Sequence, residues 1–221
     1  MNYDYVPFIA GSIAGATGAI AGHPFDTIKT NLQTNQPSSL RNLYRGLPNA
    51  ATAAVISFSF MFGVRKNLDS QIENPYLKGA IAGIGNAILI NTNEYNKIQK
   101  QNTVSPQIKW FTTRGLGVTT GREIIGLSVY FGFYDNLRNQ SISPFIAGSL
   151  TGIGCWLFSY PLDIIKTIVQ TDLKTTYRQE LRKMSFQANG LSYCLLRASI
   201  ANAIIFPVFE TTTAFLRNHT L

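Results

Sequence analysis

The chain contains 221 residues, 45% of them hydrophobic and only 14% charged, with a formal net charge of +8 at pH 7. Its mean hydropathy of +0.06 is low for a protein made of uniformly apolar spans. Such a value is expected of a helical membrane bundle whose inward faces are polar because they line a water-filled cavity. A basic chain can also bind nucleic acid, so the placement of the bases must separate these two classes.

The apolar segments predict six helices in three consecutive pairs, each long enough for a tilted crossing of an apolar layer of ~30 Å. The first helices are expected over 6–34, 76–102 and 144–171, and the second over 46–68, 115–139 and 188–215. Short polar segments near 37–45, 104–114 and 174–186 separate the partners, and the last is expected to form an amphipathic surface helix. The predicted fold class is an all-α membrane protein of one domain, 1–221, with repeats at about 1–73, 74–141 and 142–221.

Basic residues gather in every second connection, which is the orientation signal of a protein with several membrane spans. Twelve of the 19 bases lie in the last turns of the first helix of a pair or in the segment after it: Lys29, Arg41, Arg45, Lys97, Lys100, Lys109, Arg114, Lys166, Lys174, Arg178, Arg182 and Lys183. The alternate connections hold only Arg65, Lys66, Lys78 and Arg138. This distribution favours a membrane protein over a nucleic-acid surface, and no nucleic-acid partner is expected.

One motif recurs near the end of each first helix. The segments are HPFDTIKTNLQ (23–33), NTNEYNKIQKQ (91–101) and YPLDIIKTIVQ (160–170), which share an acid, a base three residues later and a glutamine four residues after that. The acids are spaced by 68 and 69 residues, as an internal repeat requires. Pro24 and Pro161 precede the acid in two copies and are expected to kink the helices, whereas Thr92 stands there in the second copy.

The acid and the base could pair within one helix, for a few tenths of a kcal/mol. That pairing does not explain why three helices carry the same charges at the same depth, where ionised groups are costly unless they are partnered. We therefore expect pairing between helices, in a ring that closes one end of a central cavity. Its members are Asp26, Lys29, Glu94, Lys97, Asp163 and Lys166. The glutamines one turn further on are expected to brace the pairs: Gln33, Gln101 and Gln170.

The pattern P-x-D-x-x-K-x-x-x-Q in three repeats resembles the mitochondrial carrier family, over nearly the whole chain. The resemblance implies six tilted helices, three short surface helices on the matrix side, and a central site reached alternately from either side. It makes the charged ring the matrix gate of a monomer in the mitochondrial inner membrane, where cardiolipin can bind and no other cofactor is implied. The departures are Thr92 and unusually short repeats, which trimmed matrix segments explain. A composition rich in Asn, Ile, Thr and Lys suits a protist or a large virus, whose carrier would serve the host mitochondrion.

The family has a second, outer gate near the end of each even-numbered helix, written aromatic-acid-x-x-base. Here YDNLR supplies Asp135 and Arg138, FETTT supplies Glu210, and FGVRK supplies Lys66. Gly63 and Thr213 replace the remaining acid and base. If each acid pairs with the base of the preceding repeat, Asp135 meets Lys66 and Glu210 meets Arg138. The third pair has then lost both members, and no charge is left alone.

Charged residues in the spans but outside both gates are candidates for binding the substrate. Arg122 and Arg197 stand 13 residues before Asp135 and Glu210 respectively, and Glu123 adjoins Arg122. A purely structural Arg122–Glu123 pair is the alternative, but neighbouring positions on a helix diverge by about 100° and do not face each other. No metal site and no enzyme pattern is expected, and His23 is interpreted as a packing or pore-lining residue.

An Arg–acid pair on the fourth helix resembles carriers of amino acids and carnitine, as do the sixth-helix segment RASIANAIIFPVFE and Gly63. Arg122 and Arg197 would take a carboxylate and Glu123 a cation, so the implied substrate is an amino acid or a carnitine-like zwitterion. An exchanger of nucleotides or deoxynucleotides such as ADP or dATP is the alternative, because the same arginines could bind phosphate. A carrier fold kept as a non-transporting scaffold is a third hypothesis, which the three intact motifs oppose.

Overall fold

The computed structural model describes residues 4–33, 43–44, 47–102, 109–171 and 191–220. Within these ranges the side chains of 26–33, 49, 97–102, 171, 193 and 220 lie outside the description. Six helices and no strand form the described part of the chain: α1 (Val6–Gln33), α2 (Leu47–Asn67), α3 (Pro75–Asn102), α4 (Leu116–Asn139), α5 (Pro144–Thr171) and α7 (Leu191–Thr220). The prediction of six helices in three pairs is confirmed. The expected surface helices fall mostly outside the described residues.

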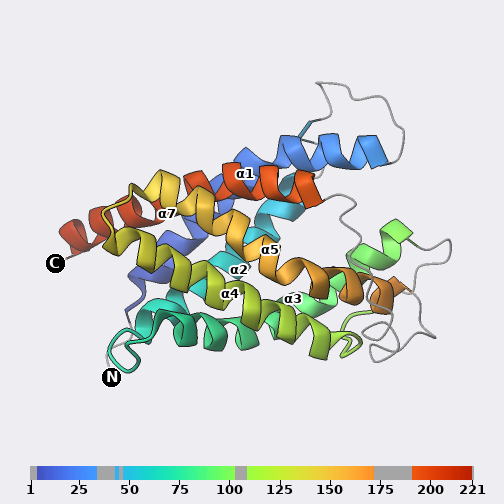
Figure 1. Cartoon of the computed structure of the whole chain (residues 1–221), viewed down its shortest axis with the longest axis horizontal. Coiled ribbons are helices and arrows are strands. Elements are labelled where there is room, and N and C mark those ends of the chain that lie inside the picture. The colour runs from blue at the N-terminus through green and yellow to red at the C-terminus, as the bar shows by residue number, and fades with distance from the viewer. Residues whose placement is uncertain (1–3, 34–42, 45–46, 103–108, 172–190, 221) are drawn as a thin grey trace.

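The helices pack as a closed ring in chain order. Each pair packs along its length, α4 contacts α5, α2 contacts α3, and α7 returns to α1. The two ends of the chain lie at the same end of the bundle (Figure 1), which we call the outer end. The short connections between α2 and α3 and between α4 and α5 turn back at this end. The opposite end therefore holds the repeated charged motifs.

In each of the three helix pairs, two glycines on the first helix set the distance to the partner helix. At the second of these glycines, an added Cβ would lie 2.7, 2.6 and 2.7 Å from a backbone carbonyl oxygen of the partner helix. The glycine–carbonyl pairs concerned are Gly15–Ala54, Gly83–Glu123 and Gly152–Ala198. No side chain fits at such distances, so the glycines allow two helix backbones to touch in a lipid environment. The equal placement in three pairs shows that the repeat extends from the motifs to the packing.

Polar side chains lie inside the bundle and large apolar side chains lie outside, which is the reverse of a water-soluble bundle. The deeply buried polar side chains include Asn86, Asn91, Thr119, Thr151 and Gln170. Large apolar side chains cover the outside, among them Ile84, Ile88, Leu157, Phe158 and Leu196. An apolar exterior around a polar interior is what a hydrocarbon solvent selects.

Three helices of the described chain are long and apolar enough to cross a membrane by length and composition. The spans are Val6–Phe25 in α1, Pro144–Gln170 in α5 and Cys194–His219 in α7. Helices α3 and α4 have a lower mean hydropathy because they supply many of the inward polar groups, such as Asn86 and Glu123.

Candidate functional site

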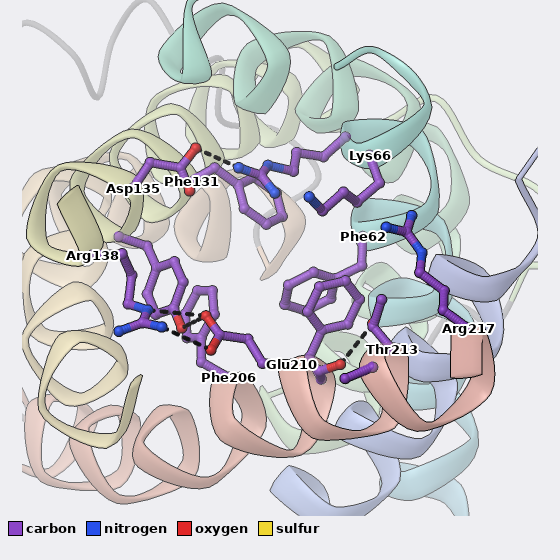
Figure 2. A pocket seen from close by; sticks show the side chains of 13 residues that line it. Phe62, Lys66, Phe131, Asp135, Arg138, Phe206, Glu210, Thr213 and Arg217 are labelled. Atoms are coloured by element: carbon purple, nitrogen blue, oxygen red, sulfur yellow. Dashed lines mark hydrogen bonds and ion pairs between the residues drawn. The ribbon is translucent and has the colours of Figure 1, made fainter. Parts of the chain in front are cut away.

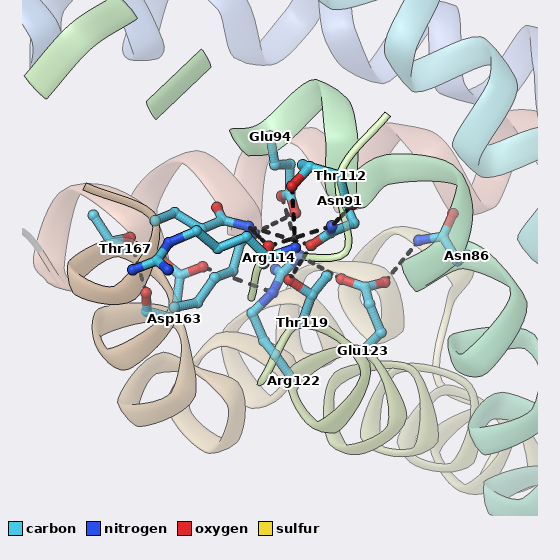
Figure 3. A network of polar contacts seen from close by, with 12 residues as sticks. Asn86, Asn91, Glu94, Thr112, Arg114, Thr119, Arg122, Glu123, Asp163 and Thr167 are labelled. Carbon is cyan, nitrogen blue, oxygen red and sulfur yellow. Dashed lines mark hydrogen bonds and ion pairs between the residues drawn. The ribbon is translucent and has the colours of Figure 1, made fainter. Parts of the chain in front are cut away.

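A network of charged side chains joins α3, α4 and α5 near the end of the bundle opposite the termini (Figure 3). Glu94 on α3 pairs with Lys166 on α5, and it also accepts a hydrogen bond of 3.2 Å from Arg122 on α4. Arg122 lies 3.7 Å from Asp163 on α5 and pairs with its neighbour Glu123. We call these five residues the central network. It is an interhelical arrangement, as the repeated motif predicts for Glu94 and Lys166.

The contact between Arg122 and Glu123 corrects an expectation drawn from helix geometry. The Cβ atoms of adjacent residues do diverge, but the arginine side chain is long enough to fold back along the helix and reach the carboxylate. Arg122 is also not separate from the ring of repeated charges, because it reaches both Glu94 and Asp163. Two of the residues predicted for the substrate therefore form one cluster with the described members of the predicted inner gate.

Burial makes the central network sensitive to the loss of any member. The side chains of Lys166 and Arg122 are only 3% and 13% exposed, whereas Glu94 and Asp163 are 29% and 28% exposed. Buried charges are tolerable only with partners, because desolvation costs several kcal/mol for each ion. The remaining predicted members of the ring, Asp26, Lys29 and Lys97, have side chains outside the described part.

A chain of hydrogen bonds fixes the second oxygen of Glu123. The side-chain amide of Asn86 on α3 donates to Glu123 Oε2 at 2.7 Å. The hydroxyl of Ser57 on α2 donates to the side-chain oxygen Oδ1 of Asn86 at 2.8 Å. Neither Asn86 nor Ser57 belongs to a repeated motif, and the sequence analysis did not select them. The available signal was a single amide in an otherwise apolar run, AIAGIGNAILI. These hydrogen bonds link Glu123 on α4 to two other helices, α3 and α2.

Gln170, the only predicted brace with a described side chain, is completely buried. Its amide donates to Asn91 on α3 at 3.2 Å and to the Arg114 carbonyl at 3.4 Å, and Thr119 donates to the same Asn91 oxygen. These bonds join α5 to α3 and to the start of α4. The bracing of charge pairs by this glutamine stays a prediction, and Gln33 and Gln101 lie outside the described side chains.

The two predicted helix-kinking prolines lie inside helices that continue on both sides. Pro24 is in α1 and Pro161 is in α5. In α3 the hydroxyl of Thr92 accepts the backbone N–H of Thr112 at 3.2 Å. The residue that replaces proline thus ties α3 to the segment that leads into α4.

Two ion pairs close the outer end of the bundle (Figure 2). Arg138 on α4 contacts both oxygens of Glu210 on α7 at 3.1 Å, as the sequence predicts. Asp135 pairs with Arg65 on α2, so the predicted Asp135–Lys66 pair is wrong. Lys66 instead lies 3.1 Å from Asp69 in the loop after α2. Arg65 is directed inward and lies over the Phe131 ring, 5.5 Å from its centroid, whereas Lys66 is one residue further around the helix.

A layer of aromatic rings lies beneath these ion pairs. Phe206 stacks on Tyr134 with centroids 3.5 Å apart, and Phe62 stacks on Phe209 at 4.0 Å. Phe131 meets Phe62 edge to face, with ring centroids 5.4 Å apart. The layer is buried and spans α2, α4 and α7. Stacked and edge-to-face rings fill the centre of the bundle here and close it to water.

Among the described side chains, the junction between α2 and α7 has no ion pair of the predicted outer-gate type. A Cβ at Gly63 would collide with the ring of Phe8, so an acidic side chain can occupy this position only if the Phe8 ring moves. Asp4 bridges this side instead: it pairs with Arg217 on α7 at 2.7 Å, and its backbone N–H donates to Asn67 on α2. The N-terminal segment therefore joins α2 to α7 where the gate pair is missing.

A cavity of about 410 Å³ opens above the aromatic layer (Figure 2), and we call it the outer cavity. Its lining includes four basic and two acidic side chains: Arg65, Lys66, Arg138, Arg217, Asp135 and Glu210. In the loop behind it, Asp69 contacts both Lys66 and Lys78. Burial raises the pKa of Asp69, but the hydrogen bond from Lys78 and the charges of Arg65 and Lys66 outweigh this and lower it below the ordinary 3.8.

The third predicted substrate residue, Arg197, lies on α7 and packs against α1. An added Cβ on Gly22 would lie 3.8 Å from Arg197 Cγ. The next residue of α1, the buried His23, stacks on Tyr44 with ring centroids 6.3 Å apart, which agrees with a packing role. Arg122 and Arg197 thus lie on different sides of the ring of helices.

Comparison with known proteins decides the family. The model of the family described as mitochondrial carrier protein matches residues 4–45 and 138–220, which is more than half of the chain. The chain belongs to the mitochondrial carrier family. The resemblance drawn from the repeated motif is thereby confirmed. Solute transport is the function class of this carrier, since the family and the relatives named below are transporters.

Several curated relatives match this carrier over nearly its whole length. A mitochondrial basic amino acids transporter of Rattus norvegicus is 28% identical, over 95% of this chain and 89% of the relative. The glutamate/glycine mitochondrial carrier ymc1 of Schizosaccharomyces pombe is 26% identical over 96% and 94%. The mitochondrial arginine transporter BAC2 of Arabidopsis thaliana is 25% identical over 96% and 91%. The likeness to the basic amino acid branch agrees with the expectation from the fourth and sixth helices.

Proposed function

We propose that this carrier exchanges an amino acid, or a carnitine-like zwitterion, across the mitochondrial inner membrane by alternating access, as a monomer surrounded by lipid. The observation that carries the proposal is the neighbouring pair Arg122 and Glu123 inside the bundle. A guanidinium beside a carboxylate complements the carboxylate and the ammonium that every amino acid carries. The named substrates of the relatives, which are basic amino acids, arginine, and glutamate and glycine, support the same class.

The sharing of Arg122 supplies a way for substrate binding to open the inner end. Arg122 contacts Glu94 and Asp163, which belong to the repeated motifs, and it also contacts Glu123. A substrate carboxylate that takes the guanidinium would remove it from these acids, and a substrate ammonium would replace it at Glu123. The substrate then offsets the loss of interactions that hold the network, and only this differential affinity can shift the population of states.

The outer ion pairs and the aromatic layer would form the second gate. In the proposed cycle, the pairs Arg65–Asp135 and Arg138–Glu210 close the outer end while the inner end is open, and they separate when the central network re-forms. The described structure has members of both sets paired. Arg197 would contribute to the site when α7 moves relative to α1.

Uptake by the purified carrier in liposomes tests this function. The panel is lysine, ornithine, carnitine, ADP and dATP, with the same solute inside as counter-substrate. We expect exchange of the amino acids, or of carnitine, and not of the nucleotides. Exchange of ADP or dATP alone would overturn the amino acid proposal in favour of a nucleotide carrier. Binding without any exchange would support a scaffold that retains the fold.

The conservative variant Glu123→Gln sharpens the assignment. It keeps the size and the hydrogen bond to Asn86 but removes the charge that would receive an ammonium. We expect the KM for lysine to rise by at least tenfold, about 1.4 kcal/mol, with normal membrane insertion. Glu73→Gln, which removes an exposed carboxylate from the loop after α2, serves as the matched control. An unchanged KM in Glu123→Gln would remove Glu123 from the site.

A further inference from the structure

The outer cavity contains an imbalance of charge that the gate does not explain. Each acid in its lining has a basic partner in the same lining: Asp135 has Arg65, and Glu210 has Arg138. The other two lining bases, Lys66 and Arg217, contact acids that are not part of the lining, Asp69 and Asp4. The interior of the cavity therefore faces two cations without an opposing anion among the residues that line it.

These two cations stand at the junction where the predicted gate pair is missing. Figure 2 shows Lys66 on α2 and Arg217 on α7, with their charged ends on the same side of the cavity and Thr213 between the helices below them. Thr213 uses its hydroxyl to bond the Phe209 carbonyl of its own helix at 2.7 Å. The position that would hold an acid, Gly63, is blocked by Phe8. The outer end therefore lacks the carboxylate that Gly63 replaces, and the carboxylate of a ligand can take its place.

The existing partners of Lys66 and Arg217 are easily exchanged. The side chains of Arg217 and Asp4 are 51% and 39% exposed, and such ion pairs contribute little because water and salt screen them. Asp69 keeps Lys78 if it loses Lys66, and one oxygen of Asp4 still accepts the Val6 N–H at 3.0 Å. An incoming anion can therefore recruit both cations, because Asp69 keeps a basic partner and the partly exposed Asp4 keeps a hydrogen bond and access to water.

We propose that Lys66 and Arg217 form an anion-receiving site in the outer cavity, which takes the anionic group of the substrate before it reaches the central network. The proposal rests on the transport function proposed above. The shared ligand chemistry is a carboxylate or a phosphate. Positive potential in a walled cavity concentrates such groups and raises their rate of association. The aromatic layer forms the floor, so the anion stays at this level until the outer pairs separate.

Binding is tested first without transport, on the purified carrier in detergent. Acetate and inorganic phosphate are titrated at constant ionic strength, against chloride as the reference anion, and the melting temperature is recorded. We expect stabilisation by acetate or phosphate that is lost in the double variant Lys66→Gln/Arg217→Gln. Asp4→Asn should strengthen it, because it releases Arg217. Lys78→Gln is the matched control, since Lys78 contacts the same Asp69 but lies outside the lining. Equal stabilisation of the double variant and the wild type would overturn the proposal.

A transport experiment then shows whether the anion that binds is the carboxylate or the phosphate of a transported solute. In liposomes, the external KM is measured for whichever member of the panel the wild type exchanges, and for an analogue without the anion: cadaverine for lysine, deoxyadenosine for dATP. The double variant should raise the KM of the anionic solute about fivefold and leave that of the analogue unchanged. If the wild type exchanges a solute and its KM is the same in the double variant, this inference fails while the transport function stands. If the wild type exchanges nothing, the transport function fails, and the anion titration alone decides the binding site.

Discussion

The two ends of the bundle hold opposite charges together in different ways. At the outer end, Arg65–Asp135 and Arg138–Glu210 are separate pairs with no common member. At the other end, Arg122 is shared by three acids, and one of these, Glu94, is shared with Lys166. Separate pairs can open one at a time, whereas a shared cation couples every contact around it.

Solvent exposure follows the same division. The Arg138 and Glu210 side chains are each 34% exposed, so water can replace much of their interaction. Arg122 and Lys166 are nearly buried and have no such substitute. The outer end is therefore expected to respond weakly to single substitutions, and the central network strongly. This contrast also explains why one binding event could release the inner end as a unit.

Loss of the shared cation should have the largest effect. Arg122→Gln leaves Glu94, Glu123 and Asp163 with Lys166 as the one cation among the described members of the network. Breaking a buried ion pair costs about 3–5 kcal/mol, so we expect exchange in liposomes to be abolished and the melting temperature in detergent to fall clearly. Arg138→Gln at the outer end should cost about 1 kcal/mol or less. Equal losses in the two variants would contradict the contrast between the ends.

Double-mutant cycles should separate the two ends by their additivity. Glu94→Gln and Lys166→Met share an interaction, so their effects on unfolding should deviate from a sum by about 0.5–3 kcal/mol. Asp135→Asn and Glu210→Gln belong to pairs without a common partner, and their effects should add within about 0.5 kcal/mol. Chemical or thermal unfolding of the four single and two double variants measures both cycles. Additivity in the Glu94–Lys166 cycle would mean that the central network is not coupled.

The fold could be predicted well because the three repeats share residue types at positions where the membrane limits the choice of side chain. The glycines that bring helix backbones together and the acids of the repeated motif recur with the same spacing, and either series alone predicts three helix pairs. The helix bounds also follow from the polar connections and agree closely with α1, α3 and α5. These are properties of local sequence, which a single chain displays.

The contacts of the site could not be predicted to the same degree, because they depend on the rotation and reach of single side chains. A motif places a base at position 66, but the packing of α2 directs Arg65 and not Lys66 toward Asp135. A helix wheel separates Arg122 from Glu123, but a flexible guanidinium removes that separation. Asn86 belongs to no motif, and only the approach of α3 to α4 shows that it holds Glu123.

The smallest expected effect is a dependence on pH in the loop behind the outer cavity. The pKa of Asp69 is lowered by Lys78, Arg65 and Lys66 against the opposing effect of burial, so its ionised form is favoured in the folded state. A lowered folded-state pKa contributes stability above the ordinary value of 3.8, and this contribution is lost as the pH falls through the folded value. The melting temperature of the wild type should therefore exceed that of Asp69→Asn slightly at pH 7, and the difference should shrink below about pH 4. High salt should reduce the same difference at pH 7, because the carboxylate is partly exposed. A difference that persists unchanged at low pH would show that the Asp69 side chain acts through its shape and not its charge.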